Sequence, residues 1–231
     1  MNAIEMFRAI EIVARALGDL RDDVMFVGGA VTPFMVTNPA APQPRETDDV
    51  DIVVDIATYA DYVQVNERLR ELGFVEDVSD GAPSCRWLLQ GVTVDVMSAG
   101  PQPGPQNRWY AEAMEHCQTF AIADDVNVRI LSPPYFIATK LDAFNDRGRG
   151  DYVPSRDIED IVAVVDGRAS IQSEVLSSPP SIRAYLAERF ATLLADTDFI
   201  DAVAGHLPGD SASQARLPLV LSRMRAIATA A

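Results

Sequence analysis

Apolar positions recur along the chain with two different periods, and each period predicts a different element. Residues Ala3 to Leu17 place apolar side chains close to every 3.6 residues, which is typical of an amphipathic helix. Val24 to Val27 and Val50 to Val54 are short apolar runs, as found in buried strands. The first run leads directly into Gly28-Gly29, and Ala30 to Val36 then has the pattern of a starting helix. The chain therefore opens as an alternation of helices and strands.

The next segment adds a helix and a hairpin to this alternation. Tyr59 to Leu72 has helical periodicity, and Arg86 to Met97 predicts two strands that turn at Gln90-Gly91. Strand-like runs follow at Thr119 to Ile122 and at Val126 to Leu131. These elements predict a mixed sheet with flanking helices.

Beyond residue 131 the pattern becomes helical. Pro133-Pro134 opens a helix that we expect to continue through Ala143, because proline is favoured in a first helical turn. The tail, Ser211 to Ala231, is predicted as one further helix. We therefore predict an α/β (α+β) domain over residues 1–131, followed by a helical domain over residues 132–231.

Composition and charge narrow the class of protein. The formal net charge is −15, which excludes a general nucleic-acid binder, because such proteins present a basic face to phosphates. No run approaches the roughly 20 apolar residues of a membrane helix. Glu5 and Arg8 interrupt the region where a signal peptide would be apolar. We expect a cytoplasmic protein that does not contact the membrane.

Three aspartates on predicted strands are the first candidate for chemistry. Asp49 and Asp51 are two residues apart, so a strand directs both carboxylates to one face, and Asp95 lies between apolar neighbours on another strand. Carboxylate oxygens are ligands that Mg²⁺ prefers, and two-metal sites catalyse displacement at phosphorus. We predict that the three carboxylates converge on Mg²⁺ or Mn²⁺. The alternative is a set of solvated carboxylates on an exposed strand face.

Two segments upstream of the aspartates are candidates for phosphate binding. Gly28-Gly29 lies between a strand and a helix, where a phosphate can approach backbone N–H groups, although a tight turn explains the same glycines. Arg45 and Thr47 offer a charged fork and a hydroxyl to a triphosphate, or alternatively cap a loop.

The order of these features resembles the DNA polymerase β superfamily of nucleotidyltransferases. The carrying residues are Gly28-Gly29, then Arg45-x-Thr47-x-Asp49-Val50-Asp51-Ile52, and later Asp95, within roughly residues 20 to 100. The spacer after Gly29 is longer than the usual pattern, and Ala30 stands where many members carry a hydroxyl. The resemblance implies the nucleotidyltransferase fold, with Asp49, Asp51 and Asp95 as catalytic metal ligands and a nucleoside triphosphate as substrate.

The second half resembles the AbiEii-type branch, known as toxins of toxin–antitoxin and abortive-infection systems. This likeness rests on the segment Val128-x-Ile130-Leu131-Ser132-Pro133 followed by Lys140, Arg147 and Asp157-x-x-Asp160-Ile161. It implies that Lys140 contacts nucleotide phosphates and that Asp157 or Asp160 supports the site, with the helical domain contributing to the active-site cleft. It also implies a cognate antitoxin as partner.

The residues themselves leave other interpretations of this half open. Lys140 is equally an exposed lysine, and Asp157 is equally a carboxylate that stabilises a helix start. Arg147, Arg149 and Arg156 form the one basic cluster, which fits a triphosphate or RNA contact or a solvated loop.

The acceptor also remains open among three classes. The resemblance favours RNA, such as a tRNA 3′ end, whereas the charge of −15 suits a cationic small molecule, as in aminoglycoside-modifying nucleotidyltransferases. The third class is a non-catalytic relative that binds a nucleotide or a protein.

Overall fold

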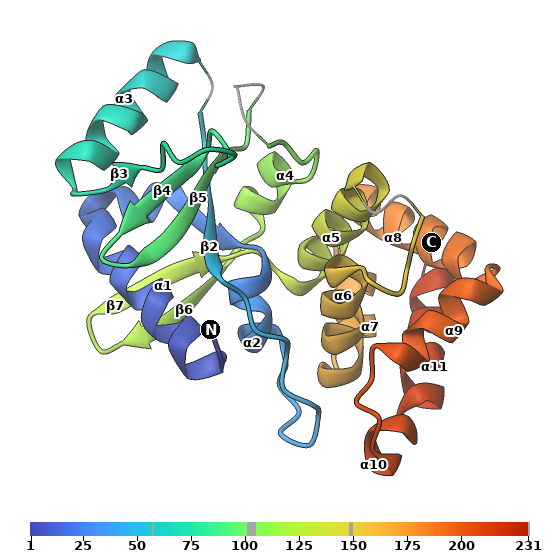
Figure 1. Cartoon of the computed structure of the whole chain (residues 1–231). Coiled ribbons are helices and arrows are strands. Elements are labelled where there is room, and N and C mark those ends of the chain that lie inside the picture. The colour runs from blue at the N-terminus through green and yellow to red at the C-terminus, as the bar shows by residue number, and fades with distance from the viewer. Residues whose placement is uncertain (57, 101–104, 148–149, 231) are drawn as a thin grey trace. The chain divides into compact units, whose positions relative to one another are not determined.

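A computed structural model describes residues 1–56, 58–100, 105–147 and 150–230. Contacts between residues divide the chain into two compact units (Figure 1). Unit 1 comprises Met1–Val31 and Glu46–Ser132, and unit 2 comprises Thr32–Arg45 and Pro133–Ala231. Unit 2 is therefore discontinuous in sequence, because an early segment belongs to it.

Unit 1 is built on a mixed sheet, as the sequence predicted. Its strands are β1 (Val24–Val27), β2 (Asp49–Val54), β3 (Val75–Glu76), β4 (Arg86–Leu89), β5 (Val92–Ser98), β6 (Gln118–Ala123) and β7 (Val126–Ile130). Their order across the sheet is β3-β4-β5-β2-β1-β7-β6. The β2–β5 and β1–β7 pairs are parallel, and the other neighbouring pairs are antiparallel. The strand that carries two aspartates is thus central.

Helices flank this sheet. They are α1 (Ala3–Leu17), η1 (Gly18–Asp23), η2 (Gly29–Val31), α3 (Tyr59–Glu71) and α4 (Tyr110–Glu115). The first, α1, begins at Asn2 with a capping box to Glu5, which satisfies backbone N–H groups that a helix start leaves open. Its buried side chains pack across one face of the sheet, against β2, β5, β6 and β7. Helix α1 thus covers one face of the sheet (Figure 1).

The β4–β5 hairpin turns where the sequence predicted. Gln90 and Gly91 have φ values of 50° and 83°, the left-handed pair that a two-residue turn requires. The turn fixes the register of the two strands, with Leu89 opposite Val92 and Arg86 opposite Asp95.

Over its described residues, the regular secondary structure of unit 2 is helical, and loops join the helices. Its helices are α2 (Thr32–Met35), α5 (Pro133–Arg147), α6 (Arg156–Gly167), α7 (Ile171–Leu176), α8 (Pro180–Leu194), α9 (Thr197–Gly205), α10 (Ser211–Gln214) and α11 (Leu217–Ala228). Helix α5 packs against α6 and α8, and α11 packs against α6, α7 and α8. Phe136, Phe190 and Phe199 are fully buried between these helices. Among the described residues, no helix has the length and apolar character needed to cross a bilayer.

The early segment that joins unit 2 is held at the end of α6. The backbone N–H groups of Thr37 and Asn38 both donate to the carbonyl oxygen of Gly167, at 3.0 and 2.9 Å. A Cβ at Gly167 would lie 2.6 Å from a methyl group of Val36, so the contact requires glycine. The backbone hydrogen bonds from Thr37 and Asn38, and the packing of the Val36 side chain against Gly167, thus hold this junction.

The prediction of a single C-terminal helix was wrong, because α10 and α11 are separate. Pro218 lies in the first turn of α11. Proline inside a continuous helix would remove a backbone hydrogen bond and clash with the preceding turn, whereas the first turn accepts it. The chain therefore ends one helix and starts another just before Pro218.

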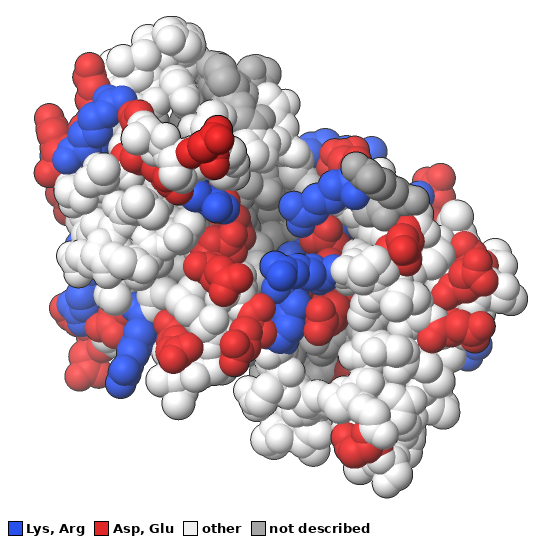
Figure 2. Space-filling view, in the orientation of Figure 1, with Lys and Arg blue, Asp and Glu red and all other residues white. Residues whose placement is uncertain are grey.

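Acidic side chains are spread over both units. Figure 2 shows red carboxylate groups on the visible surface of each unit, with blue cationic groups in smaller clusters. This distribution agrees with a net charge of −15.

Candidate active site

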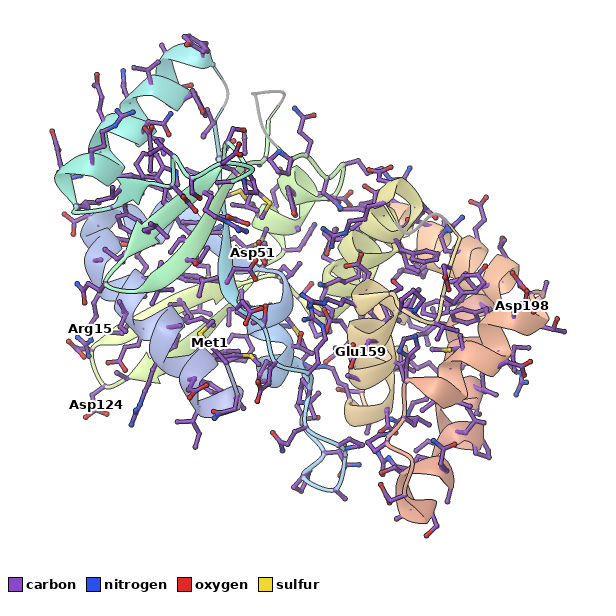
Figure 3. The ribbon with its side chains drawn as sticks, in the orientation of Figure 1. Met1, Arg15, Asp51, Asp124, Glu159 and Asp198 are labelled. Atoms are coloured by element: carbon purple, nitrogen blue, oxygen red, sulfur yellow. The ribbon has the colours of Figure 1, made fainter. Side chains whose placement is uncertain are left out.

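Asp49, Asp51 and Asp95 converge on one face of the central strands of unit 1. Asp49 and Asp51 project to the same face of β2, and the parallel register places Asp51 directly opposite Asp95 on β5. One carboxylate oxygen from each residue lies within 4.8 Å of the other two. The convergence predicted from the alternating pattern is confirmed (Figure 3 labels Asp51).

Gly28 makes room for one of these carboxylates. It follows β1 with a φ of 71°, in the left-handed region that favours glycine. A Cβ added at Gly28 would lie 1.8 Å from Oδ2 of Asp51, which no real contact allows. Gly29 is buried and begins the short helix η2. The first glycine is therefore required by the aspartate, in addition to any contact with a phosphate.

We expect Gly28→Ala to abolish any activity that depends on Asp51. The new methyl group forces the Asp51 carboxylate out of place, and the left-handed backbone costs about 1–2 kcal/mol for a residue with a Cβ. Gly73→Ala is the matched control, because Gly73 has a φ of 88° and an added Cβ meets no atom within 4 Å. Denaturant unfolding and an assay of the activity that depends on Asp51 should separate the two variants. Equal activity of both would contradict the steric role of Gly28.

Thr47 lies beside the triad and contacts it directly. Its hydroxyl donates a hydrogen bond to Oδ1 of Asp49, at 2.9 Å, and Thr47 is buried. From the sequence, Thr47 was predicted to offer this hydroxyl to a triphosphate or to cap a loop. In the structure the hydroxyl orients a carboxylate of the triad, and a contact with a triphosphate stays a prediction.

Arg86 is the residue that the sequence analysis missed. Its Nε and one terminal nitrogen donate to the two oxygens of Asp95, both at 2.8 Å, and the same terminal nitrogen lies 3.5 Å from Oδ2 of Asp49. The signal was available, because a two-residue turn at Gln90-Gly91 pairs Arg86 with Asp95 by simple counting. The triad thus has a cation of its own.

Burial and the carboxylates of the triad shift the pKa of a neighbouring thiol. Burial, followed by the charges of Asp95 and Asp51, raises the pKa of the neighbouring Cys85 thiol to about 11. The hydrogen bonds to Asp95 raise the pKa of Arg86, so its guanidinium stays charged. Cys85 therefore remains a protonated thiol at neutral pH.

A second charged cluster lies in unit 2, around Lys140. The ammonium of Lys140, on α5, lies 2.6 Å from Oδ2 of Asp160 and 3.4 Å from Oδ1 of Asp157, both on α6. Only 8% of the Lys140 side chain and 1% of the Asp160 side chain are exposed. Lys140 is thus a buried ion-paired lysine, and the alternative of a solvent-exposed lysine is wrong.

Arg147 completes this cluster at the surface. Its guanidinium donates to both oxygens of Asp157, at 3.0 and 2.8 Å. Burial of Asp157 opposes ionisation, but Arg147 and Lys140 together hold the pKa of this carboxyl below its usual value. A lowered pKa stabilises the fold at neutral pH, and this stabilisation is lost as the pH falls through the folded pKa. Asp157 also lies in the first turn of α6, where the helix dipole favours it.

Arg45 also belongs to this cluster. Its guanidinium lies 2.9 Å from Oδ1 and 3.0 Å from Oδ2 of Asp160, and 4.0 Å from Glu159. It is therefore grouped with unit 2, although Arg45 is only two residues from Thr47. Of the remaining basic residues predicted to form a patch, Arg156 is exposed at the start of α6 and Arg149 lies outside the described residues.

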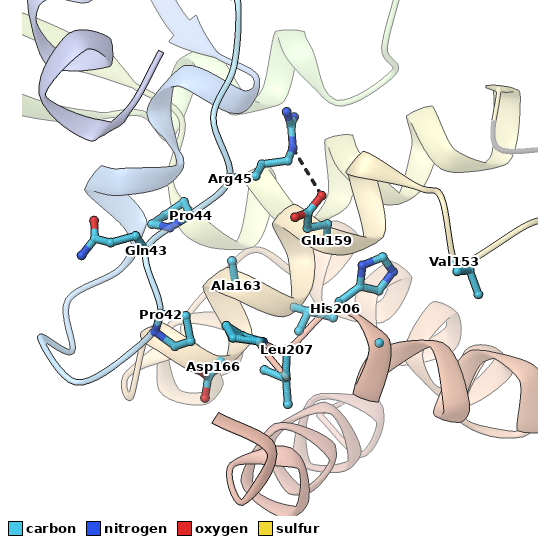
Figure 4. A pocket seen from close by; sticks show the side chains of 13 residues that line it. Pro42, Gln43, Pro44, Arg45, Val153, Glu159, Ala163, Asp166, His206 and Leu207 are labelled. Carbon is cyan, nitrogen blue, oxygen red and sulfur yellow. Dashed lines mark ion pairs between the residues drawn. The ribbon is translucent and has the colours of Figure 1, made fainter. Parts of the chain in front are cut away.

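A pocket of about 410 Å³ opens beside Arg45 within unit 2 (Figure 4). One face of α6 lines it, with Glu159, Val162, Ala163 and Asp166 at helical spacing. Three prolines, Leu207 and His206 complete much of the wall. The volume falls within the range of small-molecule sites.

The triad fits a divalent cation on the chemistry of its donors. It offers three carboxylates, and hard oxygen ligands of this type bind Mg²⁺ and Mn²⁺. Asp49, Asp51 and Asp95 are the residues that would hold the ion.

Comparison with known proteins gives one family and several folds. A family model described as nucleotidyl transferase AbiEii toxin, type IV toxin–antitoxin system, matches residues 12–226. No curated protein matches the chain. An antigenic nucleotidyltransferase-like protein from Paracoccidioides brasiliensis is 18% identical, with a TM-score of 0.53 over 89% of this chain and 94% of that chain. The antibiotic-resistance factor ANT(2″)-Ia is 17% identical, with a TM-score of 0.50 over 84% and 97%. At these identities, the solved structures share the fold.

Proposed function

Because the chain belongs to the AbiEii nucleotidyl transferase family, we propose that it transfers a nucleoside monophosphate from a nucleoside triphosphate to an acceptor hydroxyl. The observation that supports this most directly is the convergence of Asp49, Asp51 and Asp95 beside the glycine turn. The family match also confirms the resemblance drawn from the motifs. Fold likeness alone would not support an activity, so the proposal rests on the family and the site residues.

The proposed reaction is a displacement at the α-phosphorus. The acceptor oxygen forms a bond to this phosphorus, the bond to the bridging oxygen of the β-phosphate breaks, and pyrophosphate leaves. Asp49 and Asp51 would hold Mg²⁺ or Mn²⁺, which when bound would supply positive charge for the phosphate oxygens. Asp95 would complete the ligand set and accept the proton of the acceptor hydroxyl.

We assign the charged cluster of unit 2 to substrate binding. Lys140 is held by Asp157 and Asp160, and a buried, oriented ammonium is a suitable partner for a nucleotide phosphate. Arg45 and Arg147 support the cluster by pairing with the same two aspartates.

RNA is the acceptor that we propose first, with a tRNA 3′ end as the specific case. The support is family membership, since the matching model describes a toxin of a toxin–antitoxin system. The same membership suggests a cognate antitoxin as protein partner. We propose growth inhibition as the consequence of unopposed activity.

A small cationic acceptor is the second candidate, and two observations favour it. The net charge of −15 attracts cations, and the pocket of unit 2 presents Glu159, whose side chain is 40% exposed. The fold shared with an antibiotic-resistance factor is compatible with this candidate. We propose it as the alternative to RNA.

The test of the proposed function is incubation with each α-labelled nucleoside triphosphate, Mg²⁺ and either total tRNA or an aminoglycoside mixture. We expect label to appear in the tRNA and pyrophosphate to be released. Label in the small-molecule fraction would select the second candidate. Absence of label in both fractions, with every nucleotide, would contradict nucleotidyl transfer to these acceptors.

A charge-reversal pair tests the RNA acceptor separately. We expect Arg149→Glu with Arg156→Glu to weaken tRNA binding and to flatten its salt dependence, because each lost phosphate contact lowers the salt slope by about one. These changes leave the Arg147–Asp157 pair in place. The control is Arg8→Glu with Arg225→Glu, which changes the net charge equally at exposed positions elsewhere. Equal tRNA binding by both double variants would argue against this patch.

A further inference from the structure

We propose that Arg86 competes with the divalent metal for the acidic triad, so that the metal binds tightly only together with a nucleoside triphosphate. This inference rests on the proposed function and adds to it a control of metal affinity by the protein itself. It is carried by the contacts of Arg86 in unit 1.

The carboxylate oxygens of Asp95 and Asp49 already have partners in the structure. Both oxygens of Asp95 accept hydrogen bonds from Arg86 at 2.8 Å. Oδ1 of Asp49 accepts from Thr47 at 2.9 Å, and Oδ2 of Asp49 lies 3.5 Å from Arg86. All four oxygens therefore have a partner, and a cation that binds these carboxylates competes with the guanidinium for the same oxygens.

The register of the sheet fixes the pairing of Arg86 with Asp95. Arg86 and Asp95 are cross-strand neighbours on β4 and β5, so their side chains lie on the same face. Asp51 and Asp95 are neighbours on β2 and β5. The guanidinium thus belongs to the same row of the sheet as the carboxylates, and the fork geometry makes it a strong competitor.

The guanidinium of Arg86 finds a new partner only when a nucleotide binds together with the metal ion. The Arg86 side chain is 27% exposed and the Asp95 side chain 12%, so Arg86 is the more accessible partner of this pair. When a metal ion binds alone and takes the place of Arg86, the guanidinium loses its carboxylate partner Asp95 and gains no new partner. A metal ion with a triphosphate offers Arg86 phosphate oxygens, which match a guanidinium fork as well as a carboxylate does. The nucleotide therefore raises the metal affinity, and by reciprocity the metal raises the nucleotide affinity.

Arg86→Gln in the full-length protein tests this inference by metal binding rather than by activity. Free Mn²⁺ is measured by electron paramagnetic resonance, with Mn²⁺ alone and with the α,β-methylene analogue of each nucleoside triphosphate. We expect the variant to bind Mn²⁺ alone at least about tenfold more tightly than wild type, because two charge-assisted hydrogen bonds no longer compete. The gain in Mn²⁺ affinity on adding the analogue should be smaller in the variant. An unchanged or weaker affinity for Mn²⁺ alone would overturn the inference.

Arg15→Gln is the matched control, because Arg15 also binds an aspartate through both of its oxygens, at 2.8 Å, at the far end of α1 (Figure 3). It should leave Mn²⁺ binding at the wild-type level. Thermal melts in EDTA and in Mn²⁺ give a second readout, since Arg86→Gln should lose stability in EDTA and recover it in Mn²⁺. If Arg86→Gln does not fold in either condition, Arg86→Lys replaces it, and its Mn²⁺ affinity must exceed that of wild type.

A failure of the inference is distinguishable from a failure of the proposed function. Asp51→Asn should abolish Mn²⁺ binding in the presence of the analogue. If wild type binds Mn²⁺ and analogue through Asp51 but Arg86→Gln changes nothing, the function stands and the competition is wrong. If wild type binds no Mn²⁺ even with analogue, the metal site itself is wrong.

Discussion

Replacing Asp51 with asparagine should lower nucleotide transfer by at least about a thousandfold, because it removes a metal-binding charge worth several kcal/mol of transition-state stabilisation. The amide has almost the same volume as the carboxylate, so Gly28 still accommodates it and the fold should be retained. Transfer is measured with labelled nucleotide, and folding by circular dichroism and denaturant unfolding.

Asp55→Asn is the matched control for this variant. Asp55 lies just beyond β2 and is exposed, so the same chemical change occurs close in sequence but outside the triad. It should transfer nucleotide at the wild-type rate. A wild-type rate for Asp51→Asn as well would remove Asp51 from the catalytic site.

Lys140→Met should destabilise the protein strongly. The substitution leaves Asp157 and Asp160 buried without the ammonium that lies between them, and breaking a buried ion pair typically costs about 3–5 kcal/mol. We expect the lower end of this range, because Arg45 and Arg147 still pair with the two aspartates. The free energy of unfolding in urea measures the loss.

Arg147→Met provides the comparison for Lys140→Met, because it removes a cation from the same carboxylate at the surface. The Arg147 side chain is 69% exposed, and exposed pairs contribute about 1 kcal/mol or less. The loss in free energy of unfolding should therefore be several-fold larger for Lys140→Met than for Arg147→Met. A similar, small cost for both would mean that burial of Lys140 contributes little.

Lys140 is also the single lysine of the chain, which permits a labelling experiment. Acylation of its amine, followed by mass spectrometry, should be slow in the folded protein, because the side chain is 8% exposed. If Lys140 binds phosphate, saturating nucleoside triphosphate with Mg²⁺ should slow the reaction further. If saturating nucleotide leaves the labelling rate unchanged, Lys140 is a buried, ion-paired lysine that does not bind the nucleotide.

Much of unit 1 could be predicted from the sequence because its signals are local. The apolar runs at Val24 and Val50, and the Gln90-Gly91 turn, fix strands and a hairpin within a few residues of their observed bounds. Period-two alternation places Asp49 and Asp51 on one face. The strand that pairs with β2 was harder to predict from the sequence. Its pairing with β5 joins residues 44 positions apart and depends on the whole sheet.

What sequence reasoning could not supply was the choice of partner for the charges of unit 2. Lys140 has apolar neighbours at helical spacing, which is compatible with burial or with a surface position. Its burial depends on α6 presenting two aspartates to it, which is a tertiary contact between helices. Arg45 likewise reads as part of the Asp49 motif, yet its guanidinium pairs with Asp160, 115 residues later.

The junction between Val36 and Gly167 has a consequence for the order in which the chain acquires its structure during translation. Residues 32–45 are synthesised early, but the carbonyl group of Gly167, which accepts hydrogen bonds from Thr37 and Asn38, is synthesised about 130 residues later. At about 5–20 residues per second, this delay is on the order of ten seconds. Throughout that time Met35, almost fully buried in the finished protein, has no helix α6 to cover it. The helical unit is therefore closed by a segment that the ribosome releases first, and a nascent chain stalled before Gly167 would carry an uncovered apolar segment inside its N-terminal half.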